Sequence, residues 1–271
     1  MRILIIFFIF LSFNISSSGG TCGEYLSNDG LNKGVCDQVN IDPSDKASLQ
    51  RGLKLYVNYC FGCHSLKYAR YSRVSMDLDI PEDLFKENLL FGDQQIGDLM
   101  TIGMKEGDSE DWFGVAPPDL TLETSLKGAD WVYTYLKSFY IDPDRSLGVN
   151  NKVYINSAMP NVLIDLQGEQ QSVCKEIPLV ADNGGLKQDP LSGEILTDLK
   201  CGFLETKAGS GELTKEEFNL SMRDLTNFLA YMADPIKEKR EYIGVYVILY
   251  LLLFTILSYL LYREFKKDIH L

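Results

Sequence analysis

The stretch CFGCH, residues 60–64, constrains this 271-residue chain more than any other part of it. It places two of the six cysteines directly before one of only two histidines. With residues this scarce, chance predicts roughly 0.001 matches to the spacing Cys-x-x-Cys-His. The pattern therefore carries chemistry, and the fold has to hold two thiols and one imidazole together.

The spacing is typical of covalent haem attachment. Two thiols three residues apart can each form a thioether with a haem vinyl group. The next side chain can then bring its imidazole to the iron as the proximal ligand. We therefore predict one covalently bound haem c, attached through Cys60 and Cys63 and ligated by His64.

Other uses of a Cys-x-x-Cys pair stay open from the motif alone. A structural zinc site needs four ligands, and the other cysteines, at positions 22, 36, 174 and 201, lie apart from one another. A thioredoxin-like redox pair needs a βαβ context, which we do not find here. Among whole-protein classes, a haem enzyme with an open distal position and a zinc- or disulfide-stapled scaffold are the alternatives to an electron carrier.

The N-terminal residues 1–18 have the composition of a secretory signal peptide. One arginine is followed by an apolar run at positions 3–13 and then by small residues. An uncleaved membrane anchor is the alternative. A signal peptide predicts that the following segment, residues 19–236, is exported to the periplasm.

The C-terminal segment 237–262 is predicted to be a transmembrane anchor. Residues 242–262 hold no charge, and 21 residues in a helix span about 31 Å, the thickness of a hydrocarbon core. Tyrosines lie near both ends, as at a membrane interface. A buried core helix is the alternative. The export of the body leaves residues 263–271 as a cytoplasmic tail, so we expect a single-pass protein of the bacterial inner membrane.

The formal net charge of −12 argues against nucleic acid as a partner, because nucleic-acid binding needs a basic surface. The acidic run KEGDSED, residues 105–111, either forms a solvated face or attracts a basic partner.

The remaining four cysteines fit an oxidising compartment. Of their three possible pairings, the local one, Cys22–Cys36 with Cys174–Cys201, is the simplest. The second of these bridges closes a loop of about 28 residues, worth on the order of 3–4 kcal/mol in the chain-entropy model.

The sequence predicts a mainly α fold with long loops. Ser44 is expected to cap a helix that carries the apolar positions 49, 53, 56 and 60, and Pro81 to open a short helix. Asp130 is expected to cap the segment WVYTYLKSFY. Thr214 and Glu217 form a capping box before a helix with an apolar face at 222, 225, 229 and 232. Segments 92–128 and 143–212 are interpreted as loops that can wrap a large cofactor.

Taken together, these segments resemble the cytochrome c1 family in its proteobacterial form, the haem subunits of ubiquinol–cytochrome c reductases. The resemblance covers nearly the whole chain. It rests on DKASLQRGLKLYVNYCFGCHSLKYARYSR, WFGVAPPDLTL, GADWVYTYLKSFYIDP, NNKVYINSAMPNVL and the C-terminal anchor. It implies a cytochrome c-like haem domain and a place in the respiratory chain.

Carried over by position, the resemblance makes Met159 the distal iron ligand and lets Pro117 and Pro118 line the haem crevice. Many relatives have an arginine before Pro-Pro-Asp-Leu that pairs with a haem propionate. This chain has acidic residues there, which leaves Arg70, Arg73 and Trp112 as candidate partners.

Counting nearly excludes a second histidine as the sixth ligand and leaves a methionine, another side chain or an open site. The only other histidine, His270, lies beyond the membrane span. Met76, Met100 and Met104 lie 12 to 40 residues after His64 and stay the alternatives. Met159 lies 95 residues downstream, before a proline, and this order lets the chain wrap the haem and return on its far face.

The resemblance implies one-electron transfer from the Rieske iron–sulfur protein to a soluble or membrane-bound cytochrome c-type acceptor, with cytochrome b and the lipid bilayer as further partners. No catalytic residue is expected, because quinol oxidation belongs to the partner subunits.

Overall fold

The computed structural model describes residues 22, 24–27, 30–33, 35–180 and 184–269. The predicted signal peptide at 1–18 and His270 lie outside these residues. The chain divides into two compact units, one that ends at Ala233 and one that begins at Asp234. The structure is helix-rich, at 46% helical, which confirms the predicted mainly helical class with one C-terminal apolar helix.

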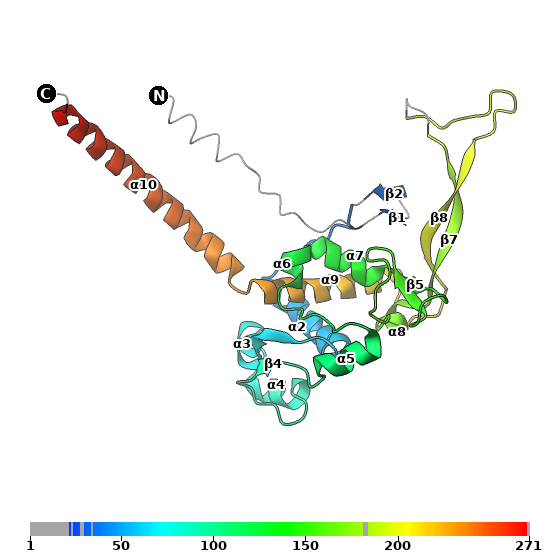
Figure 1. The fold of residues 1–271 in the computed structure, drawn as a ribbon, viewed down its shortest axis with the longest axis horizontal. Coiled ribbons are helices and arrows are strands. Elements are labelled where there is room, and N and C mark those ends of the chain that lie inside the picture. The colour runs from blue at the N-terminus through cyan, green and yellow to red at the C-terminus, as the bar shows by residue number, and fades with distance from the viewer. Residues whose placement is uncertain (1–21, 23, 28–29, 34, 181–183, 270–271) are drawn as a thin grey trace. The chain divides into compact units, whose positions relative to one another are not determined.

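The helices of the first unit are mostly short (Figure 1). They are α2 (Lys46–Leu55), which continues as the π-helical turn η1 (Tyr56–Cys60), α3 (Tyr71–Asp77), α4 (Glu82–Leu89), α5 (Glu106–Phe113), α6 (Glu123–Lys127), α7 (Ala129–Lys137), α8 (Ile164–Gln167) and α9 (Lys215–Ala233).

The strands form one four-stranded and two two-stranded sheets among the described residues. The larger sheet has the order β2 (Gly30–Lys33), β1 (Glu24–Ser27), β8 (Thr197–Thr206), β7 (Gln170–Pro178). The smaller ones pair β3 (Leu66–Arg70) with β4 (Leu99–Met100) and β5 (Phe139–Ile141) with β6 (Val149–Asn151).

Helix α9 is the central element of the first unit. It packs on α2, α6 and α7, helices from distant parts of the chain, and Figure 1 shows it running between them. All four positions of its predicted apolar face, Met222, Leu225, Leu229 and Met232, are buried in the core. The 3.6-residue periodicity in the sequence therefore identified the face that organises the core.

Two predicted helix starts are wrong by one or two residues. Asp45, not Ser44, caps α2, because its carboxylate accepts a hydrogen bond from the Ser48 amide at 3.0 Å. Helix α7 begins at Ala129, and the carboxylate of Asp130 instead accepts from the Val39 amide at 2.8 Å. In the first case the neighbouring residue is the cap, and in the second the carboxylate of the predicted cap bonds to an amide outside the helix.

Several other helix predictions are confirmed. Pro81 precedes α4, and the capping box before α9 forms, since the Glu217 amide donates to Thr214 Oγ1 at 3.3 Å while the Glu217 carboxylate accepts from the Thr214 amide at 2.9 Å. The apolar positions 49, 53, 56 and 60 of the second helix are all buried.

The two segments interpreted as loops contain regular structure. Residues 92–128 hold α5 and α6, and residues 143–212 hold β6, α8 and the hairpin of β7 and β8. In that hairpin Cys174 lies directly opposite Cys201, and the two form a disulfide. Cys22 and Cys36 form the other, so the structure contains the local pairing. The hairpin escaped the sequence reading because its two strands are separated by a Gly- and Asp-rich connection.

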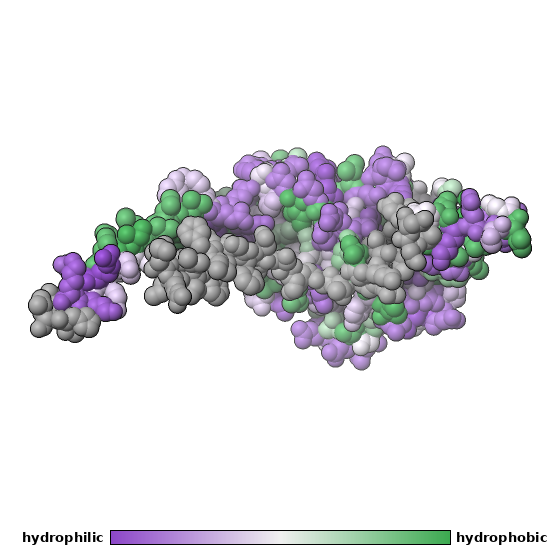
Figure 2. Space-filling view, turned by 90° about the horizontal axis from the view of Figure 1, so that it is seen from above, coloured by the Kyte–Doolittle hydropathy of each residue, from purple (hydrophilic) through white to green (hydrophobic). Residues whose placement is uncertain are grey.

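The second unit is the long helix α10 (Lys237–Ile269). Its stretch Lys237–Lys267 is long and apolar enough to cross a membrane. Its side chains between Tyr242 and Tyr262 are exposed in the isolated chain, and Figure 2 shows them as a hydrophobic stretch that ends in hydrophilic residues. Such a surface suits a lipid environment.

Helices α2 and α9 pack closely together at Gly52. A Cβ atom added there would lie 2.2 Å from the Asp224 carbonyl oxygen and 2.6 Å from Phe228 Cβ, so only glycine allows α2 and α9 to approach this closely. Beside it, the Asp224 carboxylate accepts from Ser48 Oγ at 2.7 Å and from Arg51 Nε at 2.5 Å. Burial raises the pKa of Asp224, but these hydrogen bonds outweigh burial and leave that pKa below its usual value.

Gly52→Ala is expected to destabilise the protein by about 1–3 kcal/mol, because the added methyl group meets backbone that cannot rotate away. Thermal and urea unfolding of the mature protein, followed by circular dichroism, measure the change. Gly107→Ala in α5 is the matched control, because no atom lies within 4 Å of its added Cβ. Equal stability of the two variants would show that α2 and α9 are not held at this distance.

Candidate functional site

The Cys-x-x-Cys-His motif lies at the end of the helix that crosses α9. Helix α2 widens into the π-helical turn η1, in which the Phe61 amide donates to the Tyr56 carbonyl at 2.9 Å. The amides of Cys63 and His64 then both donate to the Cys60 carbonyl, at 3.0 and 2.9 Å. This compact turn brings the three side chains of the motif to one place. Both thiols are free.

The imidazole of His64 is buried and oriented by the backbone. Its Nδ1 lies 2.7 Å from the carbonyl oxygen of Pro118. A carbonyl only accepts hydrogen bonds, so Nδ1 carries the proton and Nε2 of the neutral ring keeps its lone pair. Metal-ligating histidines generally donate their second ring nitrogen in this way.

The environment of His64 favours the neutral ring. Burial lowers the pKa of its imidazole, and the hydrogen bond to the Pro118 carbonyl only partly opposes that effect. A neutral ring with a free Nε2 is the form that coordinates iron. The residues at this motif therefore fit a haem: two thiols for the thioethers and one correctly protonated imidazole.

The Pro-Pro-Asp-Leu segment is fastened to the residues that follow the motif. Asp119 accepts from the Lys67 amide at 2.7 Å and from the Thr121 amide at 3.0 Å. The Leu120 amide donates to the Ser65 carbonyl at 3.0 Å. These bonds fix the Pro118 carbonyl beside His64. Pro117 is half-buried, and Pro118 is exposed.

Met159 lies in the loop after β6 and is held to helix α7. Its Sδ accepts a hydrogen bond from the Tyr135 hydroxyl at 3.5 Å, and that hydroxyl lies 2.8 Å from Ser157 Oγ. The Met159 side chain is half-buried. Burial raises the pKa of Tyr135 to about 12, which keeps its hydroxyl protonated and available as a donor.

Two of the three competing methionines have environments unlike that of Met159. Met100 is fully buried in the core and belongs to β4, opposite Leu66. Met76 is 66% exposed on α3. Met104 is half-buried in the loop before α5. Core packing explains Met100, and a strongly exposed side chain is a poor candidate for a haem ligand.

The three candidate propionate partners lie on separate elements. Arg70, on β3, donates to the Gly97 carbonyl at 2.6 Å. Arg73, on α3, pairs with Asp77 at 2.5 Å, and the same carboxylate oxygen accepts from the Tyr231 hydroxyl. Trp112, on α5, is 65% exposed and packs edge-on against Phe113. Both arginines thus have protein partners of their own.

The other four cysteines bear on the zinc alternative. Both pairs are closed as disulfides, so they cannot complete a four-cysteine zinc site around Cys60 and Cys63.

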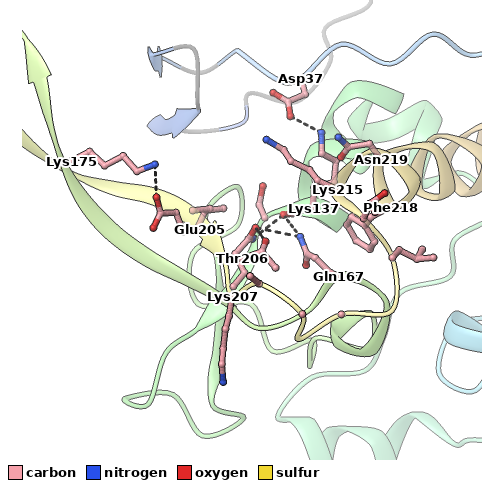
Figure 3. Close-up of a pocket in the computed structure, with 18 residues that line it drawn as sticks. Asp37, Lys137, Gln167, Lys175, Glu205, Thr206, Lys207, Lys215, Phe218 and Asn219 are labelled. Carbon is pink, nitrogen blue, oxygen red and sulfur yellow. Dashed lines mark hydrogen bonds and ion pairs between the residues drawn. The ribbon is translucent and has the colours of Figure 1, made fainter.

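A separate cavity of about 690 Å³ lies at the base of the β7–β8 hairpin (Figure 3). Its lining mixes polar and apolar groups, and it includes charged pairs: Lys137 pairs with Asp37, and Lys175 pairs with Glu205. Gln167 donates to the Lys137 carbonyl. No residue of the Cys-x-x-Cys-His motif contributes to it, nor does Met159. Because a haem c would be attached to the motif, the absence of every motif residue from the lining argues against this cavity as the haem site.

Three residues around the site were not singled out from the sequence as functional. Tyr56 donates to the His64 carbonyl at 2.6 Å, Asp119 fastens the Pro118 segment, and Tyr135 contacts Met159. Tyr56 belongs to the apolar stripe of the helix before the motif, and Asp119 belongs to Pro-Pro-Asp-Leu, so the sequence pattern could have indicated both. Tyr135 carries no such signal, because its role depends on a contact 24 residues along the chain.

Comparisons with known proteins agree with the residues at the site. A model of the cytochrome c1 family matches residues 38–90, which include the motif, and residues 209–269, which include α9 and α10. The "Cytochrome c1" of Allochromatium vinosum is 44% identical over 99% of this chain and 98% of its own length.

Two further relatives carry different names. The "Ammonia monooxygenase gamma subunit" of Nitrosomonas europaea is 37% identical over 86% of this chain and 88% of its own length. The "Cytochrome b/c1" of Bradyrhizobium diazoefficiens is 24% identical over 83% of this chain and 34% of its own length.

Replacement of both motif cysteines, Cys60→Ala with Cys63→Ala, is expected to abolish covalent haem, because no other free thiol remains among the described residues. Acid–acetone extraction of the purified protein measures this. Each single variant should keep one thioether and give a shifted absorption band. Haem that resists extraction from the double variant would contradict the assignment.

Proposed function

The chain belongs to the cytochrome c1 family, and from that premise we propose that it accepts one electron from a Rieske iron–sulfur protein and passes it to a periplasmic cytochrome c-type acceptor. The family carries covalently bound haem c, which supplies the one-electron couple when bound. The chain is an electron-transfer subunit, and bond-making chemistry belongs to the enzyme complex around it.

The observation that carries the proposal is the hydrogen bond from His64 Nδ1 to the Pro118 carbonyl. It leaves Nε2 as the free ligand atom and fixes the plane of the ring. A rigid ligand changes little between oxidation states, which keeps the reorganisation on electron transfer small. Cys60 and Cys63, one turn of backbone away, would hold the macrocycle through thioethers.

We assign the distal ligand to Met159. The assignment is supported by its half-buried side chain, which a neighbouring hydroxyl holds in place, and by the core position of Met100. A thioether ligand opposite histidine raises the reduction potential, which suits a carrier that receives electrons from a high-potential centre. Pro117 and Pro118 would line the crevice, while Arg70, Arg73 and Trp112 remain the candidate propionate partners.

The proposed topology follows from the two ends of the chain. Residues 1–18 are a signal peptide, 19–236 the periplasmic haem domain, 237–262 the membrane anchor and 263–271 a cytoplasmic tail. The exposed apolar surface of α10 supports a place in the lipid bilayer, in contact with a cytochrome b subunit. The haem domain then faces the periplasm, where the acceptor is found.

Helix α5 supports a basic acceptor. It carries four exposed acidic residues and ends four residues before the Pro117–Pro118 segment beside His64. Negative charge at this position attracts a positively charged partner and raises the association rate.

Met159→Leu is expected to keep covalent haem, to lower the reduction potential sharply and to slow oxidation of the Rieske centre, because leucine offers no ligand atom. The ferric protein should also lose the weak near-infrared band of methionine-ligated haem. Redox titration, absorption spectroscopy and stopped-flow mixing with the Rieske protein measure these changes.

Met104→Leu is the matched control and should keep both the band and the potential. If Met104→Leu or Met100→Leu removes the band while Met159→Leu keeps it, the distal ligand belongs to the earlier segment. If Met159→Leu behaves as expected but the wild-type protein takes no electron from a Rieske centre, the proposed donor is wrong.

The double variant Asp108→Asn with Asp111→Asn is expected to slow electron transfer to a basic acceptor about two- to fivefold at low ionic strength, since it removes attraction at the docking face. The difference should shrink as salt is added, because salt screens exposed charges. Stopped-flow kinetics over a salt series measures both effects.

A control variant with the same change of net charge, Glu87→Gln with Glu194→Gln, should retain the wild-type rate. Equal slowing by the control variant would show that the rate depends on the net charge of the protein and not on the acidic residues of α5. A rate that rises with salt would contradict a basic acceptor.

A further inference from the structure

The loop that carries Met159 closes a ring of hydrogen bonds on itself. The Met159 amide lies 3.3 Å from Ser157 Oγ, Ser157 Oγ lies 2.8 Å from the Tyr135 hydroxyl, and that hydroxyl lies 3.5 Å from Met159 Sδ. The ring therefore begins at the backbone of Met159 and ends at its sulfur.

The donors in this ring can be assigned from the groups themselves. An amide can only donate, so the Met159 amide donates to Ser157 Oγ. A thioether can only accept, so the Tyr135 hydroxyl must donate its single proton to Sδ. The contact between Ser157 and Tyr135 is then formed by the Ser157 hydroxyl proton. Every donor has one acceptor, and the hydrogen bonds run in one direction.

Two aromatic neighbours hold the phenol ring of Tyr135 in place. It stacks on Trp131 with centroids 5.1 Å apart and planes 7° apart, and it meets Phe139 edge-on at 5.1 Å. Its backbone carbonyl accepts from Asn151 Nδ2 at 2.8 Å, which ties helix α7 to the start of the methionine loop. The hydroxyl is therefore a fixed donor in a packed setting.

From these contacts we propose that Tyr135 is the residue that positions the Met159 thioether and, through its hydrogen bond to the sulfur, raises the reduction potential of the protein, with Ser157 orienting the tyrosine hydroxyl. The proposal rests on the assignment of Met159 as the distal ligand. Tyr135 touches the ligand and not the iron, so it acts through Met159.

The direction of the effect follows from electrostatics. A thioether sulfur has two lone pairs, and a ligating methionine uses one of them. A hydroxyl proton on the other draws electron density from the sulfur, which disfavours the more positively charged ferric state. Loss of that proton should therefore lower the reduction potential. The same bond restricts rotation of the methionine side chain and should stabilise its ligation.

Tyr135→Phe isolates the hydroxyl, since phenylalanine keeps both aromatic contacts. A neutral hydrogen bond of ordinary strength corresponds to a two- to tenfold change in the redox equilibrium constant. Redox titration of the full-length protein should thus show a potential lower by about 20–60 mV, at 59 mV per tenfold change. The near-infrared band should persist but disappear at a lower temperature on heating.

Tyr71→Phe is the matched control. Tyr71 is buried, and its hydroxyl donates one hydrogen bond, to Gln94 Oε1 at 2.9 Å. Its loss should leave the potential and the thermal midpoint of the band unchanged. Ser157→Ala provides a second variant within the ring and should lower the potential less than Tyr135→Phe, because Tyr135 can still donate to the sulfur.

The decisive comparison adds Tyr135→Phe to Met159→Leu. Without a sulfur to accept the proton, Tyr135→Phe should cause no further change in potential. A shift of full size in that background would show that the tyrosine acts through packing, and would overturn the proposal. The proposal would also be overturned if Tyr135→Phe kept the wild-type reduction potential and near-infrared band although Met159→Leu lost the band. Retention of the band in Met159→Leu would instead refute the ligand assignment itself.

Discussion

The close approach of α2 and α9 at Gly52 is the contact on which the rest of the structure depends. With a Cβ atom only 2.2 Å from a backbone oxygen, no other residue allows this crossing without displacement of a helix. Helix α2 leads directly into η1 and the Cys-x-x-Cys-His turn, while α9 also packs on α6 and α7. The crossing of α2 and α9 thus determines where both thiols and His64 lie.

Two separate parts of the chain carry the two proposed haem ligands, and both pack against α9 or the helix that crosses it. On one side, Asp119 fastens the Pro118 carbonyl, which orients His64. On the other, α7 packs on α9 and carries Tyr135, which contacts Met159. In both places the group that contacts the proposed ligand residue is a neutral hydrogen-bond partner. Neutral partners tune a buried ligand without the cost of an unpaired charge.

The parts that sequence predicted well are those with local physical causes. The apolar stripe of α9, its capping box and the motif at the end of α2 all follow from spacings of three or four residues. The β7–β8 hairpin and helices α5 and α6 were missed, because neither a Gly- and Asp-rich connection nor an acidic run shows periodicity. Met159 was predicted as a ligand through resemblance and counting, while the contact of Tyr135 with it was not expected, since that contact is formed only by the folded loop.

The most direct test of this account is iron K-edge X-ray absorption of the full-length protein in its reduced state. With His64 Nε2 and Met159 Sδ as axial ligands, the first coordination shell should contain one sulfur beside the nitrogens of the porphyrin and the imidazole. Loss of that sulfur in Met159→Leu would support the assignment. A shell of nitrogen and oxygen alone in the wild-type protein, or a sulfur that survives in Met159→Leu, would contradict it.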